Sequence, residues 1–249
     1  MPHAVARLAA ERLARSSKPF LARGGSRRVR CAGCRLPASH CICALRPQLA
    51  ADAGVCLLMH DIEPLKPSNT GWLIADLLPD TFAFGWARTQ VAPALLALLA
   101  DPGWQPYVVF PGEFVAPGRV VHALAPAPEP APGQPRRRPL FVLLDATWPQ
   151  ATKMLRKSPY LDGFPVLSLQ GGAPSRYRLR RSHGDGHLCT AEVAAHCLAL
   201  AGAPDAGAAL LDWLDLFGAR YLLAREQRPV APAGDNSALA AQPPNPSMD

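Results

Sequence analysis

One aspartate stands where an active site would be expected in a sheet-based enzyme. The apolar run Leu140–Leu144 predicts a strand buried on both faces, and it ends at Asp145-Ala146-Thr147-Trp148. Pro149 then suits the first turn of a helix that we expect to continue to Lys157. Open α/β sheets bind ligands at the carboxyl ends of their strands, and a Trp can stack on a planar ring. Asp145 is therefore a candidate site residue, with capping of the following helix as the simpler alternative.

Four cysteines within thirteen residues form the second candidate site. Cys31 and Cys34 have the two-residue gap of a zinc knuckle, and Cys41 and Cys43 follow shortly after them. His40 is an alternative ligand, because zinc also binds the nitrogen of an imidazole. Thiolates in a closed set of four are typical of structural zinc. We predict a tetrathiolate zinc site, and we expect the three remaining cysteines, Cys56, Cys189 and Cys197, to be small core residues.

Two other predicted strands also end in polar loops. Residues 55–59 run into a loop that reaches Ser68-Asn69-Thr70, and residues 107–110 run into Pro111-Gly112-Glu113. Ser68, Asn69 and Thr70 can equally cap the next helix. Acid-bearing loops at three strand ends favour a ligand site.

Strands and helices alternate along the chain. We expect further strands at 82–86 and 164–169, and helices at 71–78, 93–100, 188–200 and 205–225. This pattern predicts an α/β fold with a mostly parallel sheet. Residues 3–23 predict only a loose basic helix or tail, and the Ala/Pro-rich residues 123–139 predict a surface excursion.

The positive charge of the chain, +7 in total, is gathered in two regions. Residues 1–30 carry eight Lys or Arg against one acid, and ten more lie between Arg136 and Arg181 against two acids. Arg136-Arg137-Arg138 closes the Pro-rich stretch, whereas Arg176, Tyr177, Arg178 and Arg180 alternate charge with apolar residues. Such loops contact phosphates and stack on bases, although a solvated basic face would look the same.

The first 25 residues are too rich in Arg and Lys to supply the apolar core of a secretory signal, and no long apolar run follows them. We therefore expect a cytoplasmic protein with no membrane partner. In a reducing compartment the seven cysteines would not form a disulfide framework.

Taken in order, these motifs resemble the DTW-domain family, named for its D-x-T-W motif. The resemblance covers roughly residues 30 to 225 and rests on the cysteine cluster, Asn69-Thr70, Pro111-Gly112-Glu113, Asp145-Ala146-Thr147-Trp148, Tyr177-Arg178-Leu179-Arg180 and Thr190-Ala191-Glu192. It implies a fold related to the SPOUT methyltransferases, which carry a trefoil knot. The family commonly has Ser where Cys189 stands.

The resemblance also implies an activity. Family members transfer the 3-amino-3-carboxypropyl group of S-adenosylmethionine to N3 of a uridine in tRNA, with position 47 of the variable loop as the expected target. Asp145 is then the expected base, with Glu192 in reserve. The residues implied for the cofactor are Asn69, Thr70, Pro111, Gly112, Glu113, Thr147, Trp148 and Thr190. Those implied for tRNA are Arg136, Arg137, Arg138, Arg176, Tyr177, Arg178 and Arg180.

Two alternative functions remain: a SPOUT-type RNA methyltransferase that uses the same cofactor, and a non-catalytic zinc-knuckle protein that binds RNA. We expect the chain to divide into a basic extension (1–30), a zinc-binding module (31–46), a catalytic domain (47–226) and a disordered tail (227–249).

Overall fold

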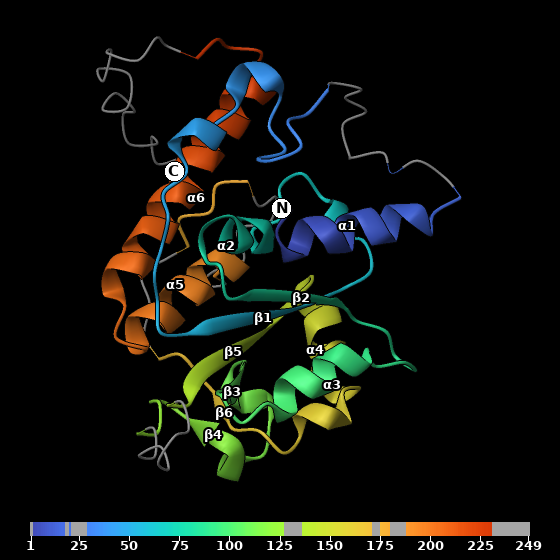
Figure 1. Cartoon of the computed structure of the whole chain (residues 1–249), viewed down its shortest axis with the longest axis vertical. Coiled ribbons are helices and arrows are strands. Elements are labelled where there is room, and N and C mark those ends of the chain that lie inside the picture. The colour runs from blue at the N-terminus through green and yellow to red at the C-terminus, as the bar shows by residue number, and fades with distance from the viewer. Residues whose placement is uncertain are drawn as a thin grey trace, which may run out of the picture.

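The structure is a computed structural model that describes residues 2–17, 20, 29–126, 136–170, 175–179 and 188–230. Six strands form one parallel sheet in the order β2-β1-β5-β3-β6-β4 (Figure 1). Their bounds are β1 Gly54–Met59, β2 Thr81–Gly85, β3 Trp104–Val109, β4 Val120–Val121, β5 Arg138–Asp145 and β6 Val166–Leu167. The expected α/β fold with a parallel sheet is confirmed, and β5 lies at its centre.

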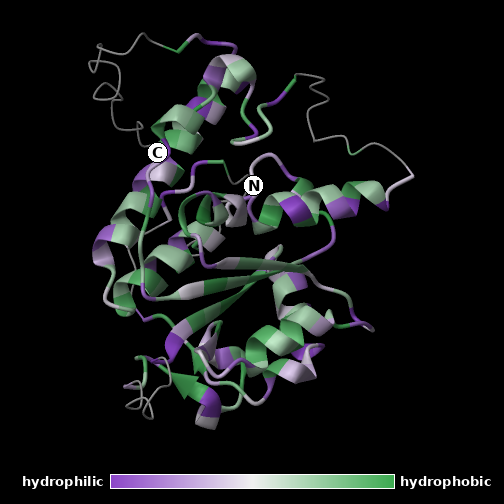
Figure 2. Ribbon diagram, viewed as in Figure 1, coloured by the Kyte–Doolittle hydropathy of each residue, from purple (hydrophilic) through white to green (hydrophobic). Residues whose placement is uncertain are grey.

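Helices cover both faces of this sheet. Their bounds are α1 Ala4–Ala14, α2 Gly71–Leu77, α3 Pro93–Ala100, α4 Trp148–Arg156, α5 Thr190–Leu200 and α6 Pro204–Arg225. Helices α3 and α4 pack on one face, and α1, α2, α5 and α6 lie on the other (Figure 1). Hydrophobic residues run along the strands and the helices packed on them (Figure 2).

The alternation of side chains along each strand builds two separate cores. Val55, Leu57 and Met59 of β1 face the four-helix side, whereas Cys56 and Leu58 face α3 and α4. All five side chains are fully buried. Burying each large apolar side chain contributes roughly 1.5–3 kcal/mol, so a strand that is apolar on both faces is held between the two helical layers.

Two elements differ from the sequence-based expectation. Helix α1 is packed rather than loose, because Val5, Leu8 and Ala9 bury a stripe at helical spacing against the sheet. Leu13 is exposed and takes no part in that stripe. Strand β4 has only two residues, too few for any period to show in the sequence.

The described helices include none that has both the length and the apolar character required to cross a bilayer.

Candidate functional site

Asp145 is the last residue of β5, and its carboxylate is buried and held on both sides. Asp145 as a whole is 4% exposed. Asn69 donates from Nδ2 to Oδ2 at 2.7 Å, and Thr190 donates from Oγ1 to Oδ1 at 2.8 Å. Burial raises the pKa of Asp145, and the two hydrogen bonds oppose that rise. The arrangement fixes a carboxylate whose affinity for a proton is increased.

The capping interpretation of Asp145 is wrong. Helix α4 is capped by Thr147, whose backbone N and Oγ1 lie 3.1 and 2.7 Å from Gln150 Oε1. These contacts are the Gln150 half of a capping box in which Thr147 is the N-cap residue. Because Thr147 performs that task, the oxygens of Asp145 are directed to Asn69 and Thr190 instead.

Asn69 combines the two roles that the sequence left open. Its Oδ1 accepts a hydrogen bond from the backbone N of Trp72 in the first turn of α2, at 3.0 Å, while its Nδ2 donates to Asp145. The helix therefore fixes which way the amide points. Gly71 permits this close approach, since a Cβ there would lie 2.6 Å from Asp145 Oδ2.

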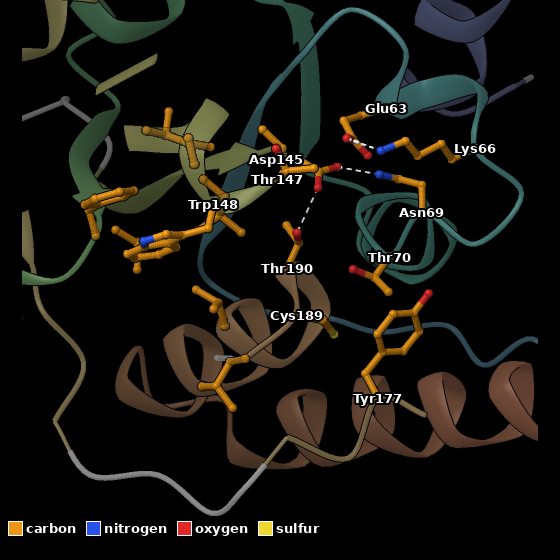
Figure 3. Close-up of a pocket in the computed structure, with 18 of the residues that line it drawn as sticks. Glu63, Lys66, Asn69, Thr70, Asp145, Thr147, Trp148, Tyr177, Cys189 and Thr190 are labelled. Atoms are coloured by element: carbon orange, nitrogen blue, oxygen red, sulfur yellow. Dashed lines mark hydrogen bonds and ion pairs between the residues drawn. The ribbon is translucent and has the colours of Figure 1, made fainter. Parts of the chain in front are cut away.

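A cavity of about 570 Å³ opens beside Asp145 at the carboxyl ends of the strands (Figure 3). Its walls come from the loop after β1, the ends of β3, β5 and β6, and the start of α5. Seven of the residues predicted from the sequence line it: Asn69, Thr70, Pro111, Asp145, Thr147, Trp148 and Thr190. Tyr177, which was predicted to contact RNA, lines it as well.

One end of this cavity is charged. Glu63 and Lys66 follow β1 and form an ion pair, and Figure 3 shows them beside Asn69 and Asp145. Glu63 is 6% exposed, and burial, together with the charge of Asp145, raises its pKa. Sequence reasoning missed both as site residues; the available signal was their place in the polar loop that follows a buried strand.

The other end is aromatic. The indole of Trp148 stacks on Phe110 with ring centroids 5.3 Å apart and planes 7° from parallel, and Phe114 meets it edge-on. Trp148 remains 38% exposed. This pair is a platform on which a planar ring can stack.

Residues 175–179 border the cavity with alternating side chains. Tyr177 and Leu179 line the cavity, whereas Arg176 and Arg178 are exposed. The hydroxyl of Tyr177 donates to the carbonyl of Ser68, which ties the segment to the loop after β1. Arg176 forms an ion pair with Asp215, and the predicted RNA contact Arg180 lies outside the described residues.

Three of the residues predicted for catalysis or for the cofactor do not line the described cavity: Gly112, Glu113 and Glu192. Glu113 is exposed, and the backbone N of Gly112 donates to Ser168. Glu192 is 2% exposed, and its oxygens accept hydrogen bonds from Cys189 N, Ser175 Oγ and Arg176 N. Glu192 thus caps α5 and holds the segment that carries Tyr177.

The cluster Arg136-Arg137-Arg138 lies at the amino end of β5, whereas Asp145 and the cavity lie at its carboxyl end. Arg138 begins β5 and Asp145 ends it, so the two are roughly 23 Å apart at about 3.3 Å per residue. Arg138 pairs with Asp80 at 2.6 Å and stacks over Trp104, and Arg137 donates to the Trp104 carbonyl.

The four cysteines form a compact cluster. The sulfur atoms of Cys31, Cys34, Cys41 and Cys43 all lie within 4.8 Å of one another, and three of the separations are 3.5 to 3.7 Å. A tetrahedral zinc site with bonds of about 2.3 Å has sulfur–sulfur edges of about 3.8 Å, so the cluster fits such an ion. His40 is not a ligand here, because its ring nitrogens bond Ser39 and the Arg228 carbonyl.

Comparison with known proteins agrees with these motifs. A family model described as DTW domain matches residues 28–222. A Drosophila melanogaster protein named tRNA-uridine aminocarboxypropyltransferase 2 is 26% identical over 183 residues, which are 70% of this chain and 67% of that protein. No solved structure matches the chain significantly.

Proposed function

Because this chain belongs to the DTW-domain family, we propose that it is a tRNA-uridine aminocarboxypropyltransferase. It transfers the 3-amino-3-carboxypropyl group of S-adenosylmethionine to N3 of a uridine, with position 47 of the variable loop as the expected target. The name of the Drosophila relative supports this assignment. The structural observation that carries it is the buried Asp145, held by Asn69 and Thr190 beside an aromatic platform in one cavity.

The cavity fits the cofactor in size and in chemistry. Its volume of about 570 Å³ lies within the range of small-molecule sites, roughly 300–1,000 Å³. The platform of Trp148 and Phe110 suits the adenine ring, and Asp145 offers a negative charge to the sulfonium. Of the residues implied for the cofactor, we retain Asn69, Thr70, Pro111, Thr147, Trp148 and Thr190.

Bound S-adenosylmethionine supplies an electrophilic γ-carbon: the N3–C bond forms as the C–S bond breaks, and methylthioadenosine leaves. Uridine N3–H is a weak acid, so its proton needs an acceptor. Asp145 is the acceptor that we assign, because burial raises its pKa and so its basicity. Asn69 and Thr190 hold its two oxygens in place, which reduces the entropy lost in positioning the base.

The tRNA is held at the rim of the cavity by Arg176 and Arg178, while Tyr177 closes its wall. A surface ion pair such as Arg176 with Asp215 contributes at most about 1 kcal/mol, so the guanidinium can exchange that partner for a phosphate. We leave Arg136, Arg137 and Arg138 out of this interface, because they lie at the opposite sheet edge.

The cysteine cluster holds one structural zinc ion in this proposal. All four ligand positions are taken by the protein, so no open position remains for substrate chemistry.

We also propose that the sheet is of the SPOUT type. The parallel strand order and a ligand cavity tied by Tyr177 to the loop after β1 support this. A crystal structure in which the chain does not thread through a loop would contradict the expected trefoil knot.

The test is product analysis with purified protein, unmodified tRNA and S-adenosylmethionine. We expect the modified uridine by nucleoside mass spectrometry, together with one methylthioadenosine per transfer. Formation of S-adenosylhomocysteine would instead indicate a methyltransferase, and absence of cofactor binding would favour an RNA-binding protein. In cells, tRNA from a deletion strain should lack the modified uridine.

A further inference from the structure

The ionisable groups of the cavity are separated from its aromatic platform. The described lining contains Glu63, Lys66, Asp145, Tyr177 and Cys189 as its ionisable side chains. Glu63, Lys66 and Asp145 gather at one end, while Trp148 lies at the other (Figure 3). An adenine ring stacked on the platform would not contact the charged end. The charged end therefore needs a separate explanation.

Resting on the proposed function, we propose that Glu63, Lys66 and Asp145 form a subsite for the α-amino acid end of S-adenosylmethionine. The ammonium of Lys66 binds the α-carboxylate, and the carboxylates of Glu63 and Asp145 face the α-ammonium. The subsite thereby selects the part of the cofactor that is transferred.

The charges of cavity and ligand are complementary. Lys66 against two carboxylates leaves the described lining with one negative charge when both acids are ionised. S-adenosylmethionine carries one net positive charge, whereas methylthioadenosine is neutral. Because attraction between charges is stronger away from water, the subsite favours the intact cofactor over the product that remains after transfer.

A zwitterion can enter without leaving a buried charge unpaired. Glu63 and Lys66 pair with each other in the structure, and Glu63 is buried. A ligand that offers a carboxylate to Lys66 and an ammonium to Glu63 replaces one ion pair by two. A ligand with only one of these groups would leave part of the set uncompensated, which is costly in a buried site.

The backbone around the pair is firmly held. The carbonyl of Lys66 accepts hydrogen bonds from Asn69 N at 3.0 Å and from Arg35 Nη1 at 3.1 Å. The guanidinium of Arg35 lies 4.4 Å from the ring centre of Trp72. Asn69 in turn bonds Asp145, so one connected set of contacts positions all three charged groups.

Three ligands measured by calorimetry separate the two halves of the subsite. S-adenosylmethionine has both groups, decarboxylated S-adenosylmethionine lacks the carboxylate, and methylthioadenosine lacks the whole arm. Lys66→Met should weaken binding of S-adenosylmethionine by ~10-fold or more, as expected for a lost hydrogen bond to a charged group, and leave the other two ligands as tight or tighter. Glu63→Gln should weaken both ligands that carry the ammonium and spare methylthioadenosine.

The control variants are measured by the same calorimetry with the same three ligands. Lys153→Met removes an equal charge from an exposed position of α4 outside the described lining, and it should change none of the affinities. Lys66→Arg keeps the charge and should retain the preference for the ligand that carries the carboxylate. This variant still tests the subsite if Lys66→Met does not fold. Equal weakening of all three ligands, or no weakening, would overturn the subsite.

Failure of the subsite and failure of the proposed function give different results. If wild-type protein forms methylthioadenosine but the variants lose no selectivity, the subsite alone is wrong. If it forms S-adenosylhomocysteine while the variants behave as expected, the proposed transfer is wrong and the subsite stands. If it binds none of the three ligands, both are wrong.

Discussion

At the scale of single residues, Asp145 is both the last residue of the inner strand β5 and the residue that we assign as the base. Its two oxygens are held by Asn69 and Thr190 and it lines the cavity, so the proton acceptor is already oriented before the uridine arrives. A carboxylate in this position is costly to bury, and its raised pKa reflects that cost. Retaining it at the centre of the sheet is more easily explained by function than by stability.

Asp145→Asn should lower single-turnover transfer by ~10²-fold or more at saturating cofactor, because the amide is not a base. Folding should change little, since Asn can still accept from Asn69, and the hydroxyl of Thr190 can turn to accept from its amide. Wild-type activity should rise with pH as Asp145 loses its proton, at a pH above the ordinary range of an aspartate. The variant should lose that dependence.

Asp162→Asn is the matched control for Asp145→Asn, because Asp162 is an exposed acid that pairs with Arg119 at 3.3 Å. It should leave the rate and its pH dependence unchanged. A wild-type transfer rate in the Asp145 variant would exclude Asp145 as the base.

The position of Asp145 at the end of β5 was predictable because a strand buried on both faces has a recognisable end. The sequence could not separate Asn69 as a cap from Asn69 as a partner of Asp145, since both roles use the same side chain. Glu63 and Lys66 were missed because their loop reaches the cavity only through the pairing of β1 with β5. Glu113 was included on its position after a strand, yet its side chain is exposed.

At the scale of elements, the cysteine module (residues 31–46) is attached to α2, the helix that follows Asn69 and Thr70. Trp72 of α2 donates from Nε1 to the Gly33 carbonyl at 2.9 Å, and Arg46 pairs with Asp76 of α2 at 2.8 Å. The same helix accepts the Asn69 cap. A disturbed cysteine module should therefore affect α2 and the adjoining cavity.

Purified protein should contain one equivalent of zinc, and Cys34→Ser should lose it together with thermal stability, because metal binding is coupled to folding. Metal content and unfolding temperature are measured on the same samples. Cys197→Ser is the control, since Cys197 is buried in the core away from the cluster: it should keep the zinc whatever it does to stability. A zinc-free preparation as stable as the zinc-loaded protein would contradict the structural role.

The long elements were predictable and the short or docked ones were not. Strands β1, β3 and β5 have enough apolar residues to show their type, whereas the two residues of β4 depend on pairing with β6. The helical stripe of α1 is built from Val5, Leu8 and Ala9, and small residues such as Ala give a weak signal. What decides those cases is tertiary packing, which a local pattern does not contain.

At the scale of the whole molecule, the basic residues between Arg136 and Arg181 are divided between the two ends of the strands. The cavity opens at the carboxyl ends of the strands, beside Arg176 and Arg178, while Arg136 and Arg137 precede the amino end of β5. When a uridine enters the cavity, the adjoining phosphates of the tRNA pass close to Arg176 and Arg178. The RNA interface is therefore expected at the carboxyl ends of the strands.

Binding of tRNA should weaken with salt, because arginine contacts to phosphates release counterions. Replacing both Arg176 and Arg178 by Gln should reduce the slope of log affinity against log salt by ~1.5, at about 0.7–0.9 per lost phosphate contact. The double variant Arg136→Gln, Arg137→Gln removes the same charge from the opposite edge and should keep the wild-type slope. Cofactor affinity should be unchanged in both, since none of these four side chains lines the described cavity. The opposite result, a slope reduced only by the Arg136 and Arg137 changes, would move the RNA to the amino edge. The tRNA would then have to extend roughly 23 Å, the length of β5, from those arginines to bring its uridine to Asp145.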